Sequence, residues 1–131
     1  MEELKNVLIL VARICIGSLF LWAAWEKITH WSGTVLYMRE RNLPQVSLFL
    51  PAVIVVQVLG GLGIIAGYQT RVAAVVLILF LLPAMVIFHN FWNFSGKERN
   101  IEKTLFMKDV AVLGGLLLLV VCGGGTISVN G

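Results

Sequence analysis

The sequence predicts an all-α protein, a transmembrane four-helix bundle with a short interfacial helix between its first and second spans. Hydrophobic residues make up 59% of the chain and charged residues only 13%, which is too little charge for the surface of a water-soluble domain. The apolar residues also fall into four blocks, each close to the ~20 residues that a helix needs to cross a hydrocarbon core of ~30 Å. These blocks are residues 7–25, 46–66, 72–88 and 105–122. We therefore expect residues 1–131 to form a single transmembrane domain whose main partner is the lipid bilayer.

The first helix is expected at about residues 5–27, and it is interpreted as a permanent span because no small-residue cleavage motif follows it. The next segment, 28–43, contains "WSGTVLYMRERN", in which Trp31, Val35 and Met38 share one face of a helix. This pattern predicts a short helix that lies at the membrane interface and ends before Pro44.

The second helix begins near Gln45 and contains "QVLGGLGIIAG". Gly60, Gly63 and Gly67 recur along one side of it, and small residues let helix backbones approach closely in lipid. These glycines predict a tight helix–helix seam. A third helix is expected over 70–92, and a polar loop over 97–103 then leads to the fourth helix, which ends at the "GGG" of 123–125.

The distribution of basic residues predicts the orientation of the bundle. The side that holds both termini carries Lys5 and Arg71, whereas the two longer loops on the other side carry six basic residues. Loops rich in Lys and Arg face the cytoplasm, so both termini are predicted to be non-cytoplasmic. This topology also accounts for the basic residues themselves, and we expect no nucleic-acid partner.

The sequence offers little support for a metal site or for nucleophilic catalysis. His30 and His89 are the two histidines, and neither has a ligand-spaced partner. No Ser/His/Asp or Cys/His set is recognisable, so no catalytic residue is assigned and enzymatic activity is left open. Cys15 and Cys122 differ in predicted depth by about ten residues, or ~15 Å, which is too far for a disulfide.

Two polar residues are predicted to meet inside the bundle. Arg13 lies twelve residues before Trp25, and Gln57 lies eleven residues after Val46, so both fall near the predicted midplane. A charged side chain at the bilayer centre costs at least about 2.5–3.5 kcal/mol and therefore seeks partners within the bundle. We expect an Arg13–Gln57 contact, either as a structural pair that fixes helix register or as part of the lining of a ligand cavity.

A second polar group is expected at the cytoplasmic end. Lys27 follows Arg13 along one inward-facing stripe, and its predicted ion-pair partner is Asp109 at the start of the fourth helix. Glu26 and His30 are expected to be solvated.

Aromatic residues and a histidine surround this group. Trp22 and its aromatic neighbours fit either an aromatic belt at the membrane boundary or the mouth of a cleft. His89 is either a solvated histidine or a residue that exchanges a proton with the head group of a quinone entering from the bilayer.

Several stretches resemble the DoxX-like family of four-helix integral membrane proteins. "ARICIGSLFLWAAWEKI" resembles the opening helix of the family, and "QVLGGLGIIAGYQTRVAAVVL" resembles its second helix with paired glycines and a Thr-Arg turn. "MKDVAVLGGLLLLVVCGGGTISVN" resembles its last helix and Gly-rich tail, and His89 matches a histidine near the end of its third helix. Members commonly carry glutamate at the position of Gln57, so the resemblance implies that Arg13 lacks its usual counter-ion here. Some members are subunits of membrane redox enzymes such as thiosulfate:quinone oxidoreductase, and distant relatives act as cargo receptors or assembly chaperones.

Together, the residues and the resemblance favour a redox-associated membrane subunit that binds a quinone or a similar lipophilic small molecule near the cytoplasmic leaflet. Because no metal or flavin site is recognisable, electron transfer would need a redox partner protein, and a homodimer is plausible through the glycine-bearing face. A non-catalytic scaffold or chaperone for partner membrane proteins and a small lipid or metabolite transporter remain alternatives. The predicted ligand-binding residues are Arg13, Trp22, Lys27, Gln57, His89 and Asp109.

Overall fold

The computed structural model describes residues 1–129, which form α-helices joined by short connections and contain no strand. The elements are α1 (Glu2–Thr29), α2 (Trp31–Glu40), α3 (Val46–Ala66), α4 (Thr70–Phe88), the 3-10 turn η1 (Phe91–Asn93) and α5 (Gly96–Cys122). Helices α1, α3, α4 and α5 are long and apolar enough to cross a membrane, with the α4 span continuing through η1. The predicted all-α four-helix bundle is confirmed, and α2 is the predicted short helix between the first two spans.

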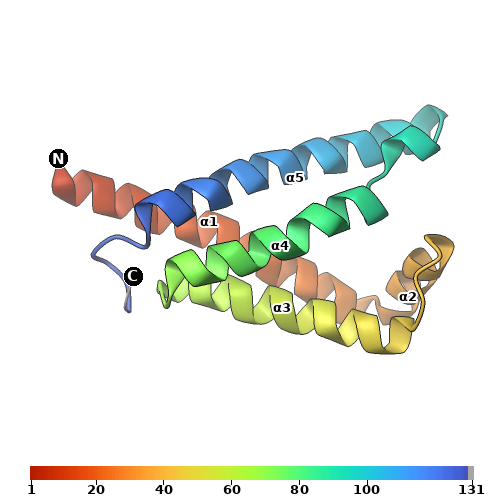
Figure 1. The fold of residues 1–131 in the computed structure, drawn as a ribbon, viewed down its shortest axis with the longest axis horizontal. Helices are drawn as coiled ribbons and strands as arrows, with labels where there is room; N and C mark the ends of the chain where they lie inside the picture. The colour runs from red at the N-terminus through yellow and green to blue at the C-terminus, as the bar shows by residue number, and fades with distance from the viewer. Residues whose placement is uncertain (130–131) are drawn as a thin grey trace.

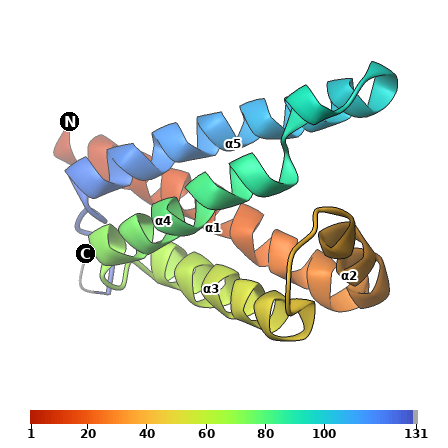
Figure 2. The same ribbon diagram turned by 45° about the vertical axis from the view of Figure 1, so that its right-hand side comes forward.

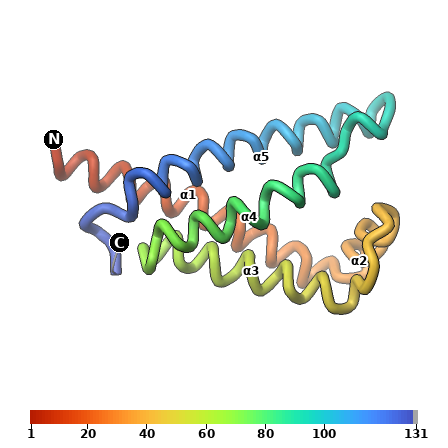
Figure 3. The backbone as a smooth tube through the Cα atoms, viewed as in Figure 1, coloured from red at the N-terminus to blue at the C-terminus, as the bar shows by residue number. Residues whose placement is uncertain are grey.

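The long helices run side by side, with both chain ends at one end of the bundle and α2 and the α4–α5 connection at the other (Figure 1). Helices α3 and α4 form a hairpin, α1 packs mainly on α3, and α5 packs mainly on α4 (Figure 2). The segment after α5 turns back across the end of the bundle (Figure 3), where the Val129 amide donates to the Ala66 carbonyl at 3.1 Å.

Glycines set the spacing between α3 and its two neighbours. A Cβ added to Gly61 would lie 3.0 Å from the Gly17 carbonyl oxygen of α1, and one added to Gly60 would lie 2.6 Å from Leu77 of α4. The predicted glycine seam is therefore divided: Gly60 faces α4, whereas the neighbouring Gly61 makes the close approach to α1.

The core contains aliphatic side chains from α3, α4 and α5 together with Phe20 of α1. The outward faces are also apolar, since Leu59, Leu79 and Leu118 are each about two-thirds exposed. An apolar exterior of this kind suits helices that are surrounded by lipid rather than by water.

The fourth long helix starts earlier than the hydrophobic pattern predicted. Residues 97–103 were expected to form a polar loop, but α5 begins at Gly96 and includes them. The hydrophobic block marks only the part of a helix that lies in the membrane, and strong helix formers such as Lys, Glu and Arg continue this helix beyond it. Glu102 is consequently placed on a buried face of α5 rather than in a loop.

Candidate functional site

A cavity of about 120 Å³, partly open to the outside and here called the internal cavity, lies between α1, α3, α4 and α5. An apolar cavity of ~150 Å³ is known to hold benzene, so this space is about the size of one six-membered ring. Aromatic and aliphatic side chains, including Phe20, Phe80 and Leu81, form most of the wall. Its polar lining consists of Lys27, Gln57, His89, Lys108 and Asp109.

Gln57 brings an unpaired polar atom to this cavity from α3. The residue is only 5% exposed, and its Oε1 atom has no hydrogen-bond partner among the described residues. Leaving a buried acceptor unpaired costs about 1–3 kcal/mol, and such atoms in native structures usually bind water or a ligand. The Gln57 amide is therefore a polar group that is available inside an otherwise apolar wall.

His89 lies at the end of α4, where it bridges two buried carboxylates of α5. Its Nδ1 atom is 2.8 Å from Oε2 of Glu102, and its Nε2 atom is 3.6 Å from Oδ2 of Asp109. Glu102 and Asp109 are seven residues apart, which places them on the same face of α5 about two turns apart. The imidazole therefore connects the cavity, which His89 and Asp109 line, to the Glu102 carboxylate outside it.

Glu102 is in turn bound by Tyr37 of α2 and by Arg41, the residue that follows α2. Nη2 of Arg41 lies 3.0 Å from Oε1 of Glu102, and the Tyr37 hydroxyl lies 3.2 Å from the same oxygen, sharing its one proton between this atom and the Phe88 carbonyl at 2.9 Å. Both residues also donate to the Phe88 carbonyl at the end of α4, which has no partner within its own helix. These contacts join α2 to the ends of α4 and α5 through one buried charged group, and buried charges of this kind require such pairing.

The guanidinium of Arg41 also stacks on the Tyr37 ring, 3.6 Å from its centroid. Burial raises the pKa of the Tyr37 hydroxyl, and the Glu102 carboxylate raises it further although Arg41 opposes the shift. Tyr37 is thus held as a hydroxyl that donates hydrogen bonds.

The predicted Lys27–Asp109 ion pair is wrong. Both residues line the cavity, but Asp109 pairs with His89 and with Lys108, whose Nζ atom is 3.5 Å from Oδ1. Lys27 is half-buried, and its Nζ atom lies 3.5 Å from the Ala23 carbonyl one turn back on its own helix. The long side chain of Lys108 bends back to the Asp109 carboxylate next to it in the chain.

The predicted Arg13–Gln57 contact is also wrong. Arg13 is 1% exposed, and its guanidinium donates to four backbone carbonyls at the terminal end of the bundle. The acceptors are Ile64 and Ile65 at the end of α3 and Gly124 and Ile127 in the segment after α5. Gln57 precedes Ile64 by seven residues, or ~10 Å along α3, so the guanidinium lies too far along the helix. Arg13 thus places its charge at the negative end of the α3 dipole and not in the cavity.

The other residues singled out in the sequence lie at the surface. Trp22 is 60% exposed and borders a shallow groove with Lys27 rather than the internal cavity. Glu26 and His30 border the same groove and are exposed, as expected. Within the described part of the chain, no three His, Cys, Asp or Glu side chains come together in a way that could hold a metal ion.

Sequence reasoning missed Glu102, Tyr37 and Arg41. The seven-residue spacing between Glu102 and Asp109 was the available signal, because it places two carboxylates on one helical face. Because residues 97–103 were predicted to form a loop, Glu102 was not placed on the helix that carries Asp109.

Comparison with known proteins places this architecture in a family. Residues 8–90 match the family model described as DoxX. The chain belongs to the DoxX family. Residues 53–131 of this DoxX-family protein also match the model described as the SURF4 family. No solved structure matches the chain.

Relatives of this DoxX-family protein include two inner membrane proteins of Escherichia coli (strain K12). YqjF is 38% identical over 130 residues, which cover 99% of this chain and 95% of that protein. YphA is 33% identical over 126 residues, which cover 96% of this chain and 90% of that protein. The ER-derived vesicles protein ERV29 of Saccharomyces cerevisiae is 30% identical over 77 residues, covering 59% of this chain and 25% of that protein. With its four apolar helices, the chain is a multi-pass integral membrane protein in contact with the lipid bilayer.

Proposed function

We propose that this DoxX-family protein is a redox-associated membrane subunit that binds the ring of a quinone, or of a similar lipophilic small molecule, in the internal cavity. The buried Oε1 atom of Gln57, an acceptor without a partner in residues 1–129 and suited to a hydroxyl of the reduced ring, is the observation that carries the proposal. The size of the cavity, about 120 Å³, supports a single ring with its tail left outside.

The polar groups of the cavity suit a ligand with oxygen atoms on opposite edges. Lys27 can donate hydrogen bonds only, whereas the Gln57 amide can both donate and accept. The Nε2 atom of His89, which lies 3.6 Å from Asp109, can donate or accept a hydrogen bond to a ligand. A quinone ring presents two carbonyl oxygens and its reduced form presents two hydroxyls, so this set could contact either form. Arg13 and Trp22, which do not line the cavity, have no part in this proposal.

The proposal treats residues 1–131 as one DoxX-like domain with non-cytoplasmic termini, so that His89 lies near the cytoplasmic leaflet. Electrons would be exchanged with a separate redox partner protein. A homodimer would need a surface other than Gly60 and Gly61, since these glycines pack against α4 and α1 of the same chain.

The binding test uses two valines that lie close together on α3 but on opposite faces of the helix. Val53 lines the cavity and is 4% exposed, whereas Val55 is 53% exposed on the outer face. 2-Decyl-1,4-benzoquinone, whose ring carries one tail and no other substituent, is titrated by calorimetry into the protein in lipid nanodiscs. We expect saturable binding by the native protein and by Val55→Phe, and at least tenfold weaker binding by Val53→Phe and by Gln57→Leu.

The same titration separates the alternatives. A scaffold or chaperone predicts no saturable binding by the native protein, and that result would overturn the quinone proposal. A small transporter predicts binding together with uptake of the ligand into proteoliposomes. Equal affinities of Val53→Phe and Val55→Phe would show that the ring binds elsewhere.

A further inference from the structure

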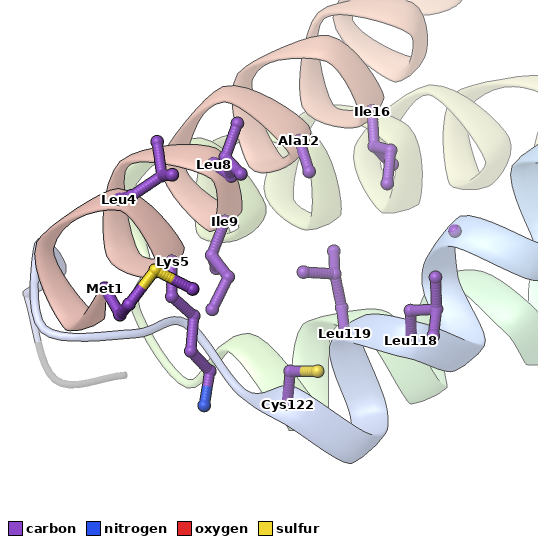
Figure 4. Close-up of a pocket in the computed structure, with 11 residues that line it drawn as sticks. Met1, Leu4, Lys5, Leu8, Ile9, Ala12, Ile16, Leu118, Leu119 and Cys122 are labelled. Atoms are coloured by element: carbon purple, nitrogen blue, oxygen red, sulfur yellow. The ribbon is translucent and has the colours of Figure 1, made fainter.

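A second hollow lies at the other end of the bundle from His89, between α1 and α5. This groove has a volume of about 420 Å³, which is within the range of small-molecule sites. Figure 4 shows Leu8, Ala12 and Ile16 along the α1 side and Leu118 and Cys122 on the α5 side. Its lining is apolar except for Lys5.

The inner end of the groove is closed. A Cβ added to Gly115 of α5 would lie 2.9 Å from Cδ1 of Ile16, so the two helices touch at this level. The internal cavity begins one turn further on, where Leu19 and Val112 line it. The groove and the cavity are therefore separate spaces, and the groove has its open end near Lys5.

The length of the groove matches one leaflet of a bilayer. Lys5 and Ile16 are eleven residues apart on α1. This separation corresponds to ~16 Å of helix, about half of a ~30 Å hydrocarbon core. A hydrocarbon chain that starts at the level of Lys5 would therefore end near the Ile16–Gly115 contact.

The charge of the groove lies at its mouth. Lys5 is exposed, and its amino group lies at the end of the groove that Cys122 also borders (Figure 4). It forms no ion pair with any residue in the range 1–129, and the acidic Glu2 and Glu3 are not part of the lining. A lysine at a helix end can extend its amino group to the headgroup layer, where it attracts anionic lipids.

We propose that this groove binds one acyl chain of an anionic phospholipid, with the lipid phosphate placed at Lys5. The groove is apolar and open to the outside of the bundle, and in a bilayer the apolar groups that can pack against its walls are acyl chains. The lysine then selects lipids whose headgroup carries a net negative charge. This site is independent of the proposed quinone cavity.

The test compares two phospholipids with identical dioleoyl chains, phosphatidylglycerol and phosphatidylcholine, together with free oleate. Each is titrated into delipidated protein, and bound molecules are counted by native mass spectrometry. We expect one phosphatidylglycerol to bind at least tenfold more tightly than phosphatidylcholine, and Lys5→Gln to remove this preference. Lys103→Gln, a charge change at the opposite end of the bundle, should keep it.

A pair of neighbouring residues on α1 tests the groove itself. Ala12 lines the groove, whereas Val11 lies outside it and is 49% exposed. Ala12→Trp should abolish the binding of phosphatidylglycerol, and Val11→Trp should not. The proposal would be overturned if the two phospholipids bound equally well or if Ala12→Trp still bound phosphatidylglycerol. It would also be overturned if oleate bound at Lys5 and neither phospholipid did.

Discussion

The Nδ1 atom of His89 lies 2.8 Å from Oε2 of Glu102, and this contact connects the internal cavity with the α2 side of the bundle. Glu102 lines an outer pocket with Tyr37 and Arg41, whereas His89 lines the cavity. A single carboxylate therefore holds α2 in place and also orients the imidazole that faces the proposed ligand. Its removal should affect stability and the site together.

Glu102→Gln should lower the free energy of unfolding by about 3 kcal/mol, because it leaves the buried Arg41 without its counter-charge. The measurement is thermal unfolding of the purified protein in detergent. Glu98→Gln, one turn earlier on α5 and exposed, is the control and should change stability by less than about 0.5 kcal/mol. Similar losses in both variants would show that the Arg41–Glu102 pair contributes nothing specific.

Tyr37 gives the protein a defined response to alkaline pH. Because its pKa is raised in the folded state, the folded protein keeps the phenol proton after the unfolded chain has begun to lose it near a pH of about 10. The unfolded state then binds fewer protons than the folded state, so stability falls as pH rises above that value.

Tyr37→Phe should lower stability near neutral pH by about 1 kcal/mol, through loss of the hydrogen bonds to Phe88 and Glu102. The difference from the native protein should shrink above pH ~10, where the native protein loses this contribution. Unfolding is measured from pH 8 to 11. Tyr68→Phe, at an exposed tyrosine, should leave the pH dependence unchanged, and a constant deficit in Tyr37→Phe at all pH values would contradict the argument.

Arg13 is predicted to fix the segment after α5. Its planar guanidinium reaches carbonyls of α3 and of that segment at once, and the compact ammonium of lysine cannot reproduce this geometry. Arg13→Lys should therefore raise amide hydrogen exchange of residues 123–129 at least tenfold while α3 stays protected. Arg71→Lys, at an exposed arginine that donates to Val121, is the control. Unchanged exchange in Arg13→Lys would show that the segment is held by other contacts.

The sequence was sufficient to predict which face of α1 points inward, but not how far the helices are shifted along one another. Gly17, Phe20 and Ala24 lie on the predicted stripe between Arg13 and Lys27, and these three residues are buried together with Arg13. Depth was counted from the ends of hydrophobic blocks, which do not coincide with the ends of helices. That counting placed Arg13 beside Gln57, whereas the structure places it beside Ile64.

The polar cluster was predicted only in part for a related reason. His89 and Asp109 were placed together because both lie near the ends of apolar blocks. Their partners Glu102, Tyr37 and Arg41 come from segments that the pattern described as a loop or as an interfacial helix. Contacts between such segments depend on tertiary packing, which hydrophobic periodicity does not encode.

The spacing of α1 and α3 also controls the cavity, because residues of both helices line it. Gly61→Leu should force the helices apart, since even a Cβ there would lie 3.0 Å from the Gly17 carbonyl, and overpacking of this kind costs about 1–3 kcal/mol. Gly114→Leu is the matched control, because a Cβ at Gly114 has no heavy atom within 4 Å in the described chain apart from its chain neighbours and the nearby backbone of α5. It should be neutral or stabilising, since glycine is a poor helix former. Thermal unfolding of both variants and their titration with 2-decyl-1,4-benzoquinone should show lower stability and weaker binding for Gly61→Leu alone. Native-like binding by a destabilised Gly61→Leu protein would mean that the cavity does not depend on this contact.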